Sequence, residues 1–407
     1  MEHLSEMMGG DQRFLKRINR LKILNTLRSK GPLSKTQLAR LSGLNNKTIT
    51  NIIEYLIKKG IVTSVGLLKT DEGRKKEHFK LNSDYCFSIG IDLGASHISA
   101  ILINLEGKIL LKKTFNFRFG LKKDIVLEKI FALAQSLIEE AKDKLEKIIG
   151  IGFTAPGFFD IKRGVWEEAV NIKDWKQVPI KKLLEERFNK KVYLEDCSRS
   201  MALGELWYGK GKDIKDFILL DLGQGIGCGI VINGILLEGK GLKAGEIGHL
   251  IIDENGPVCT CGNRGCLEAC ASGRALVSKV QEEIRKGQKT KIYDLVNGKV
   301  DEITLQDVIE AASLQDSFAI EVLEEAGHRI GRVVSFLINI FNPPLIVLGG
   351  QLSISGKHFT GSLIETARKY SMAKIFKETE IKISNLGPFG AALGAATIAI
   401  QETLFTL

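Results

Sequence analysis

The sequence lacks the features that would place it in a membrane or outside the cell. No apolar run within its 407 residues approaches the roughly 18 that a transmembrane helix needs. The first residues, MEHLSEMMGGDQRF, lack the apolar stretch of a signal peptide. Because 44% of the residues are hydrophobic, the chain can bury a large core. We therefore expect a globular, cytoplasmic protein of two or three domains.

A disulfide framework is also unexpected, because the 7 cysteines are odd in number. Cys259, Cys261 and Cys266 are crowded into one short segment. This spacing favours metal binding in a reducing compartment over disulfide pairing.

Most of the chain lacks net charge. Residues 1–80 contain 17 Lys and Arg against 7 Asp and Glu, whereas the remainder contains 41 of each kind. The net charge of +10 therefore lies entirely in the N-terminal fifth. A basic head on a neutral body suits a polyanion such as DNA. A solvated basic face with no partner would give the same counts, so charge alone does not decide between the two.

The basic segment has the pattern of a helix-turn-helix. A first helix, ended by a Gly-Pro pair, is predicted from apolar residues at helical spacing: Phe14, Ile18, Leu21, Leu24 and Leu27. Ser34 and Gln37 form a capping box that starts a second helix, which ends at Gly43. Asn45 caps a third helix, and Gly60 ends it.

The third helix is the predicted recognition helix. In a helix-turn-helix the second of two short helices enters the major groove, and its N-terminal residues contact bases. Here the residues near that end are polar or basic while the opposite side is apolar. We therefore expect base contacts from Lys47, Thr48, Thr50 and Asn51.

A wing is expected to follow. The segments IVTSVGLLK and KEHFKL predict two strands joined by the loop TDEGRKK. The basic tip would place Arg74, Lys75 and Lys76 against phosphates or in a narrow minor groove. A three-helix bundle with a hairpin can also be a protein-interaction module, but the localised charge favours operator DNA as the partner.

Two glycine-rich turns divide the body of the chain. From residue 86 the pattern predicts three antiparallel strands, with Asp92, Gly94 and Ser96 at the first turn. The segment from residue 217 repeats this design around a loop with four spaced glycines. Such turns allow a phosphate or another backbone to approach closely. The repetition predicts a duplicated α/β fold of two lobes with a cleft between them.

A metal site gives the most specific local signal. The C-x-C-x4-C spacing with a histidine upstream provides one imidazole and three thiolates, a set suited to tetrahedral zinc: His249, Cys259, Cys261 and Cys266. No position is left for a catalytic water, so we expect a structural zinc. Buried free cysteines are the alternative. Cys270, one helical turn after Cys266, is expected to be a core residue rather than a fifth ligand.

Several short motifs follow one another along the body. They are an Asp-x-Gly turn, a Pro-Gly loop at 156–157, Glu195-Asp196 followed by Ala-x-Gly-Glu, a G-x-G-I-G-x-G loop, E-x-G-H and C-x-C-G-x-x-G-C-L-E. This order resembles the ROK family of repressors and sugar kinases over residues 84–407. With the basic head included, the whole chain resembles the repressors of that family.

The resemblance implies an α/β fold class: an N-terminal winged helix-turn-helix plus a two-lobed actin-like or hexokinase-like (ribonuclease H-like) sensor. We expect the head at 1–82, a first lobe at 83–194 plus 385–407, and a second lobe at 195–384. The second lobe would carry the zinc knuckle and dimerisation helices, giving a homodimer or tetramer. Residues 307–341 have helical period and predict a continuous helix in which Gly331 permits close packing.

The resemblance also implies a sugar site. It places Asp196 where the kinases have the base that deprotonates the sugar, and it makes the sugar-binding residues Glu195, Asp196, Glu246, His249 and Glu268. The effector would be a monosaccharide: glucose, xylose or a derivative. Carboxylates accept hydrogen bonds from hydroxyl pairs, and a metal-bound imidazole is rigidly aimed. Ordinary solvated glutamates are the alternative for Glu246 and Glu268.

The nucleotide side departs from the kinases. Gly94-Ala95-Ser96-His97 stands where they have Gly-Gly-Thr-Lys, Gln224 replaces a threonine, and Glu195 replaces an asparagine. Losing several contacts to the transferred group should weaken phosphoryl transfer. We therefore expect a kinase-derived sugar sensor that acts as a repressor and is not an enzyme. The alternatives are an active ATP-dependent sugar kinase with a DNA-binding appendage, and a DNA-binding protein with a vestigial sensor.

Overall fold

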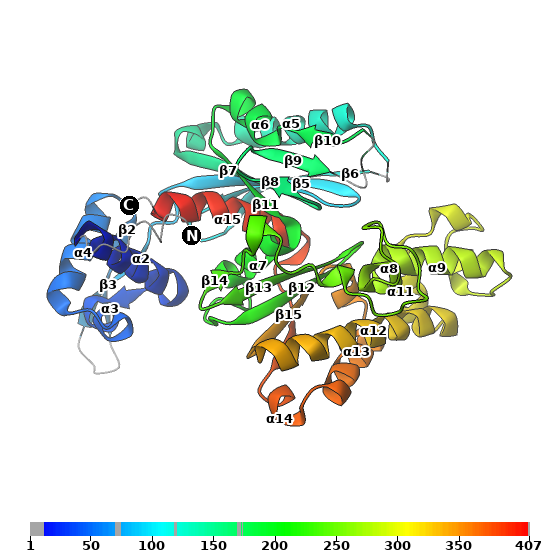
Figure 1. The fold of residues 1–407 in the computed structure, drawn as a ribbon. Coiled ribbons are helices and arrows are strands. Elements are labelled where there is room, and N and C mark those ends of the chain that lie inside the picture. The colour runs from blue at the N-terminus through cyan, green and yellow to red at the C-terminus, as the bar shows by residue number, and fades with distance from the viewer. Residues whose placement is uncertain (1–11, 70–74, 118–119, 169–171, 173, 406–407) are drawn as a thin grey trace. The chain divides into compact units, whose positions relative to one another are not determined.

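The computed structural model describes residues 12–69, 75–117, 120–168, 172 and 174–405 (Figure 1). The chain forms two compact units. The first comprises Met1–Thr154, Pro179–Leu194 and Ala392–Leu407, and the second comprises Ala155–Val178 and Glu195–Ala391. The limits of the three predicted domains stay a prediction.

The three helices of the head are confirmed: α2 (Gln12–Lys30), α3 (Lys35–Ser42) and α4 (Asn46–Lys58). Ser34 caps α3 in the predicted capping box, and Asn45 Oδ1 caps α4 by accepting a 2.8 Å hydrogen bond from the Thr48 amide. Ile23, Leu24 and Leu27 bury the inner side of α2. Ile18, predicted to face inward, is 40% exposed.

The wing is a three-stranded sheet in the order β1-β3-β2. Its strands are β1 (Leu33–Ser34), β2 (Val62–Lys69) and β3 (Lys75–Leu81). The short β1, which the sequence pattern did not indicate, pairs with β3. The predicted loop was too long, because the ladder of β2 and β3 extends to Lys75 opposite Lys69. Lys75 and Lys76 therefore lie on a strand rather than at the tip, and Arg74 lies outside the described residues.

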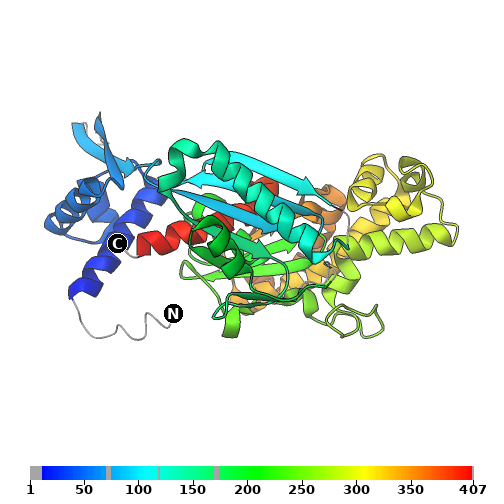
Figure 2. The ribbon, with the colours of Figure 1, turned by 90° about the horizontal axis from the view of Figure 1, so that it is seen from above.

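The first large sheet has the order β11-β7-β4-β5-β6. The predicted antiparallel meander is confirmed as β4 (Phe87–Leu93), β5 (His97–Asn104) and β6 (Ile109–Asn116). β7 (Ile148–Ala155) runs parallel to β4, and β11 (Val192–Asp196) forms the other edge. The helix α5 (Lys123–Glu140) lies across β5 and β6 (Figure 2), and α6 (Ile180–Phe188) precedes β11.

The C-terminal helix α15 (Gly390–Phe405) packs closely on this sheet because two strand residues lack side chains. A Cβ at Gly90 would lie 1.9 Å from the Ala392 carbonyl oxygen, and one at Gly152 would lie 1.8 Å from that of Ala395. The predicted small-residue helix is therefore confirmed, and the glycines of the sheet complement it.

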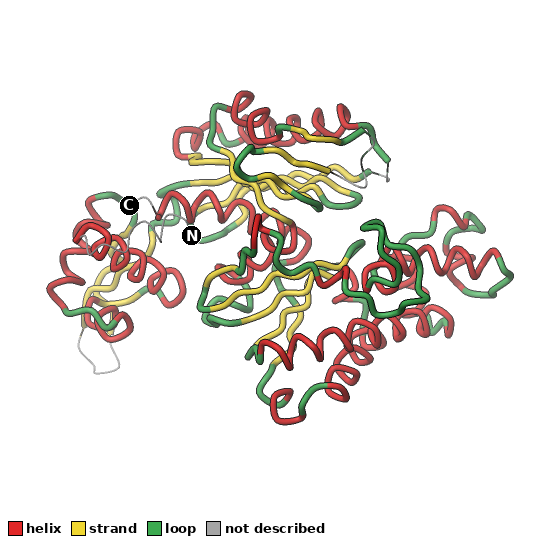
Figure 3. Tube along the Cα trace, viewed as in Figure 1, coloured by secondary structure: helices red, strands yellow, loops and turns green. Residues whose placement is uncertain are grey.

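The second large sheet has the order β14-β13-β12-β15-β16. Figure 3 draws strands in yellow and helices in red. Its strands are β12 (Phe217–Leu222), β13 (Ile226–Ile232), β14 (Ile235–Leu236), β15 (Leu345–Gly349) and β16 (Glu380–Ile383). β12 and β13 are antiparallel, whereas β15 is parallel to both of its neighbours.

The predicted loop with four spaced glycines is shorter than expected, because Gly227 and Gly229 lie on β13, where they admit the helix α7 (Cys197–Tyr208). A Cβ at Gly227 would lie 1.9 Å from Ser198 Oγ, and one at Gly229 would lie 2.4 Å from Ala202 Cβ. These glycines therefore allow a close approach of protein to protein, which is one of the two roles that the sequence suggested.

The remaining elements of the second unit are mostly helical. They are α8 (Leu267–Ala271), α9 (Gly273–Arg285), α10 (Lys291–Leu295), α11 (Leu305–Ser313), α12 (Ser317–Phe341), α13 (Lys357–Tyr370) and α14 (Ala373–Phe376). A small sheet joins β8 (Phe159–Asp160), β9 (Val165–Glu168) and β10 (Lys176–Val178).

The prediction of one continuous helix over 307–341 was wrong. The chain turns at Gln315, whose φ is 61°, and Asp316 then caps α12 by accepting a 2.8 Å hydrogen bond from the Ala319 amide. The predicted role of Gly331 is confirmed, since a Cβ there would lie 2.5 Å from the Leu363 carbonyl oxygen of α13.

Within the described part of the chain, no helix has both the length and the apolar character needed to cross a bilayer. The expected cellular location stays a prediction.

Candidate metal centre and carboxylate pocket

The four predicted metal ligands meet in the second unit. The ligand atoms of His249, Cys259, Cys261 and Cys266 all lie within 4.8 Å of one another. His249 Nδ1 is 3.5 Å from Cys259 Sγ, and the Sγ atoms of Cys261 and Cys266 are 3.6 Å apart. A tetrahedral zinc with Zn–S bonds of about 2.3 Å places its sulfurs about 3.8 Å apart. The donor set and its spacing therefore fit one zinc ion.

Backbone contacts hold this cluster together. Isolated bridges join Ile251 to Cys266 and Val258 to Arg264, so the loop folds back on itself. Gly265 has a φ of +70°, and a Cβ there would lie 1.5 Å from the Asp253 carbonyl oxygen. Cys270 is outside the cluster, and burial raises the pKa of its thiol. These backbone contacts bring the four candidate ligands into one loop.

His249 also connects the cluster to a second group. It ends the short 3₁₀ helix Ile247–His249, and its Nε2 lies 3.8 Å from Glu246 Oε2. A metal bound at Nδ1 would fix the ring and therefore the edge that faces Glu246.

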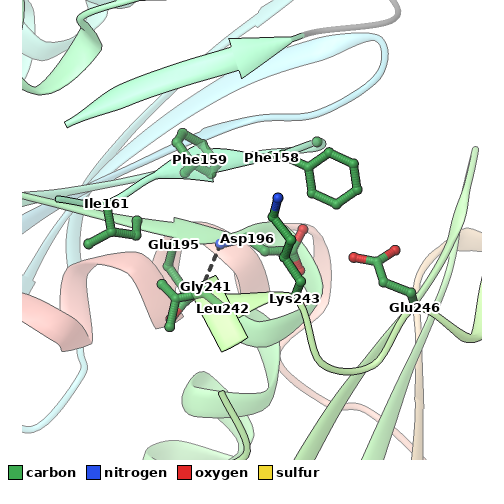
Figure 4. Close-up of a pocket in the computed structure, with 10 residues that line it drawn as sticks. Phe158, Phe159, Ile161, Glu195, Asp196, Gly241, Leu242, Lys243 and Glu246 are labelled. Carbon is green, nitrogen blue, oxygen red and sulfur yellow. Dashed lines mark hydrogen bonds between the residues drawn. The ribbon is translucent and has the colours of Figure 1, made fainter. Parts of the chain in front are cut away.

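Glu246 lines a small pocket in the second unit (Figure 4). The pocket is bounded by Gly157, Phe158, Phe159, Ile161, Glu195, Asp196, Gly241, Leu242, Lys243 and Glu246. Its volume is about 10 Å³, which is room for about one water molecule. Three of the predicted sugar residues, Glu195, Asp196 and Glu246, therefore share one pocket.

Asp196 lies at the junction of β11 and α7. Its Oδ1 caps α7 by accepting hydrogen bonds from the amides of Ser198 (2.9 Å) and Arg199 (3.1 Å). Burial raises the pKa of Asp196 to about 7, despite the hydrogen bond from Arg199. The nearby carboxylates of Glu195, Glu246 and Asp221 raise it further. This carboxyl group can therefore gain or lose a proton near neutral pH.

Glu195 is held by Arg199, a residue that the sequence analysis missed. Arg199 Nε donates to Glu195 Oε1 at 2.8 Å, and only 2% of Arg199 is exposed. Arg199 Nη1 also donates to the carbonyl of Leu237. The i, i+4 spacing of the two residues is visible in the sequence, but the strand-to-helix junction that buries the pair is not.

Glu246 and Glu268 differ in their surroundings. Burial raises the pKa of Glu246, and the charge of Glu268 adds to this, while His249 and Lys243 oppose it. Glu268 accepts hydrogen bonds from the Ile226 amide (3.0 Å) and from Arg274 Nη2 (3.1 Å). Glu268 is therefore close enough to influence Glu246 but does not line the pocket.

Phe158 and Lys243 line the pocket and were not among the predicted residues. Lys243 Nζ lies 4.6 Å from the centroid of the Phe158 ring. The two residues are far apart in the sequence and belong to no motif recognised there.

The first glycine turn contains a histidine contact. His97 Nε2 lies 3.1 Å from Asp92 Oδ2, and a Cβ at Gly94 would lie 2.2 Å from His97 Cε1. The imidazole thus occupies space beside the turn where the sequence had indicated that a phosphate could approach.

The predicted base-contacting residues lie together at the N-terminal end of α4. Lys47 and Asn51 are exposed, while Thr48 and Thr50 are half-buried. The opposite side of the helix is buried through Ile49, Ile52, Ile53 and Leu56. Lys75 on β3 is exposed and Lys76 is half-buried.

Comparison with known proteins gives matches over nearly the whole chain. The ROK family model matches residues 88–402, and a winged helix-turn-helix DNA-binding model matches residues 16–63. A xylose repressor of Caldicellulosiruptor bescii is 34% identical over 395 residues, which cover 97% of this chain and 98% of the relative.

Two further relatives show the range of similar proteins. A glucokinase of Thermotoga maritima is 34% identical over 316 residues, covering 78% of this chain and 98% of the enzyme. A solved ROK family transcriptional regulator, a homologue of the Escherichia coli MLC protein, has a TM-score of 0.79 at 25% identity. That similarity covers 96% of this chain and 97% of the regulator.

Proposed function

Because the chain belongs to the ROK family and is a sugar-responsive transcriptional repressor, we propose that a monosaccharide binds in the carboxylate pocket and weakens operator binding. Xylose is the first candidate, since the similar repressor of C. bescii is named for it. The observation that carries the proposal is the convergence of Asp196 and Glu246 in one pocket, with His249 against Glu246. Glu195 and Glu268 complete the proposed sugar site, and paired carboxylates suit sugar hydroxyls.

We propose that the metal is one structural zinc per chain, held by His249, Cys259, Cys261 and Cys266. When bound, zinc would supply a rigid tetrahedral link that fixes His249 beside Glu246. Support comes from the donor types and from their mutual spacing within 4.8 Å.

We propose that the sensor does not carry out phosphoryl transfer. Support comes from His97 beside the first turn and from Gln224 in the second. The competing candidate is an active sugar kinase, favoured by the pKa of Asp196 near 7 and by the similarity to a glucokinase. Sugar-dependent ATP turnover at about 1 s⁻¹ or faster would establish the kinase.

We propose that Lys47, Thr48, Thr50 and Asn51 contact operator bases, while Arg74, Lys75 and Lys76 contact backbone or minor groove. Support comes from the shared position of the first four on α4. Arg74→Ala should reduce the salt dependence of operator affinity by about one unit of slope, whereas Lys377→Ala, far from the head in the sequence, should not. An unchanged slope for Arg74→Ala would contradict its contact with DNA.

We also propose a homodimer or tetramer. Support comes from apolar side chains that α12 leaves exposed, including Phe336 (46%) and Ile340 (71%). Two heads at a fixed separation would match operator half-sites spaced by whole turns of DNA.

The test of the effector proposal is an operator titration with and without xylose. We expect xylose to weaken operator binding of the wild type about 5- to 150-fold. Glu246→Ala should abolish this response and leave sugar-free operator binding nearly unchanged. Glu254→Ala, an exposed glutamate outside the pocket, is the matched control and should respond like the wild type. Equal affinities of the wild type across xylose, glucose and their derivatives would overturn the proposal.

A further inference from the structure

We infer that Phe158 and Lys243 form a lid over the carboxylate pocket, which opens to admit the sugar and closes on it. In the closed state the lid supplies an aromatic face and an ammonium donor to the bound sugar. This inference rests on the proposed function, because it concerns the same pocket.

The pocket is too small for a sugar as it stands. Its volume of about 10 Å³ holds about one water molecule, whereas a pentose has about ten non-hydrogen atoms and needs several times that space. Some lining residues must therefore move before the pocket can enclose a sugar.

Most of the lining is fixed by contacts elsewhere. Asp196 caps α7 through two amides, and Glu195 is held by the buried Arg199. Phe159 stacks on Trp166, with ring centroids 5.7 Å apart and an interplanar angle of 23°. These residues form the floor and one wall.

Phe158 and Lys243 are different, because each is exposed and each meets the other. Phe158 is 41% exposed, and its ring lies 4.6 Å from Lys243 Nζ, within the range of a cation–π contact. In the described part of the chain, no ion pair within 4.0 Å joins Lys243 to Asp196 or Glu246. The ammonium is therefore held at the pocket by the ring, and Figure 4 shows the two side chains together above the carboxylates.

Both lid residues lie beside glycines in left-handed conformations. Gly157, with φ +102°, precedes Phe158, and Lys243 lies between Gly241 (φ +69°) and Gly245 (φ +97°). A Cβ at Gly241 would meet nothing within 4 Å, whereas one at Gly157 would lie 2.6 Å from the Glu168 carbonyl oxygen and one at Gly245 would lie 2.3 Å from that of Cys228. Free space therefore surrounds the loop at Gly241 and not at the other two glycines. Loops that close over ligands commonly pivot at a few such residues.

The lid also completes the hydrogen-bonding chemistry of the pocket. A carboxylate that is ionised only accepts hydrogen bonds, whereas a sugar hydroxyl both donates and accepts. Among the described lining residues, Lys243 is the one whose side chain only donates. A sugar held between the carboxylates and Lys243 can satisfy both roles.

Tryptophan fluorescence can follow the lid. Phe159, next to Phe158, stacks on Trp166, which packs on Trp175 with centroids 4.3 Å apart. Movement of Phe158 should therefore change the emission of this pair. The experiment is stopped-flow mixing of the full-length protein with xylose, with calorimetry for the equilibrium constant.

The variants are Lys243→Met, which keeps the stem and removes the charge, and Phe158→Leu. Lys240→Met is the matched control, since it is an exposed lysine of the same loop outside the pocket. Lys243→Met should raise the association rate constant of xylose about 2- to 5-fold, because a cation–π contact that holds the lid shut is lost. It should raise the dissociation rate constant more than this, so that the Kd rises, because a contact to bound sugar is lost as well. Lys240→Met should change neither rate constant.

The outcomes separate the lid from the proposed function. Xylose binding to Lys243→Met with both rate constants of the wild type would overturn the lid and leave the effector proposal intact. A Kd for Lys243→Met equal to or below that of the wild type would contradict the predicted contact of Lys243 with the bound sugar. No binding of any monosaccharide to any of these folded proteins would overturn the proposed function, and the lid with it. If Phe158→Leu does not fold, Lys243→Met and its control, Lys240→Met, still test the lid.

Discussion

The metal cluster and the carboxylate pocket lie next to each other in the second unit, where His249 of the cluster contacts Glu246 of the pocket. The two sites differ in how their side chains are arranged. At the cluster, the ligand atoms of His249 and the three cysteines lie within 4.8 Å of one another. At the pocket, carboxylates crowd one another, the pKa of Asp196 is raised to about 7, and the space between the side chains is about 10 Å³.

This difference indicates which of the two sites can change its conformation. With zinc bound as proposed, the cluster would hold His249 in one position. A pocket of crowded carboxylates beside exposed side chains can exist in more than one arrangement, and a ligand that binds one arrangement better will shift the population. The pair of His249 and Glu246 is where the fixed site meets the variable one.

Removing a ligand from the metal cluster should have the largest effect on stability. Cys261→Ser removes one of four ligands, and because structural zinc contributes its binding energy to folding, the Tm should fall by about 10 °C or more. The sugar response should fall with it, since His249 loses its anchor. Differential scanning calorimetry and metal analysis check this, with one zinc per chain expected in the wild type.

Cys270→Ser is the control for that substitution, because this thiol lies outside the cluster. Its zinc content should equal that of the wild type. A wild-type protein without stoichiometric metal would sink the prediction of a structural zinc.

Breaking the ion pair of Glu195 and Arg199 in the pocket wall should lower the stability of the protein less than the loss of a zinc ligand. Arg199→Met leaves the carboxylate of Glu195 buried without its partner, which typically destabilises a protein by about 3–5 kcal/mol. Urea unfolding measures the loss. The double variant Glu195→Leu/Arg199→Met should recover much of the stability, because it removes both charges. Equal stability of the single and double variants would show that the pair acts through shape rather than charge.

The smallest expected effect is the change in stability with pH that the carboxyl group of Asp196 causes. Since the pKa of Asp196 is about 7 in the folded protein against about 3.8 when unfolded, the native state binds more protons over this range. The contribution of Asp196 to stability therefore falls as pH rises from about 4 to about 7. Asp196→Asn cannot ionise and keeps a capping oxygen, so its stability relative to the wild type should increase from pH 5 to pH 8, by about 2–3 kcal/mol. Urea unfolding at both pH values checks the sign, and a constant difference between the two proteins would contradict the raised pKa.

The sequence predicted best those features that are set by residues close together in the chain. The capping residues Ser34 and Asn45 bond to amides only a few positions away, so their helices began as expected. The four candidate metal ligands also lie together as expected, because three of them belong to one short loop whose spacing constrains it.

The sequence did not predict features that depend on contacts between segments far apart in the chain. Arg199 looks like an ordinary surface arginine of a helix until β13 and β14 cover it, and Lys243 acquires its neighbour Phe158 from a distant segment. The break at Gln315 was missed because the apolar period continues across it. The start of β3 at Lys75 depends on pairing with β2, which strand patterns alone do not fix.

One residue of the head, Ser34, belongs to two elements at once. It pairs with His78 of β3 in the wing, and its hydroxyl caps α3, which leads through the turn at Gly43 into α4. The residue that starts α3 therefore also belongs to the wing sheet, which ties α3 to β3. If α4 and the wing contact DNA as proposed, this link should keep the distance between the two contacts nearly constant. Inserting one base pair between the major-groove and minor-groove contacts of a half-site would rotate one set by about 34° relative to the other and should then weaken operator binding.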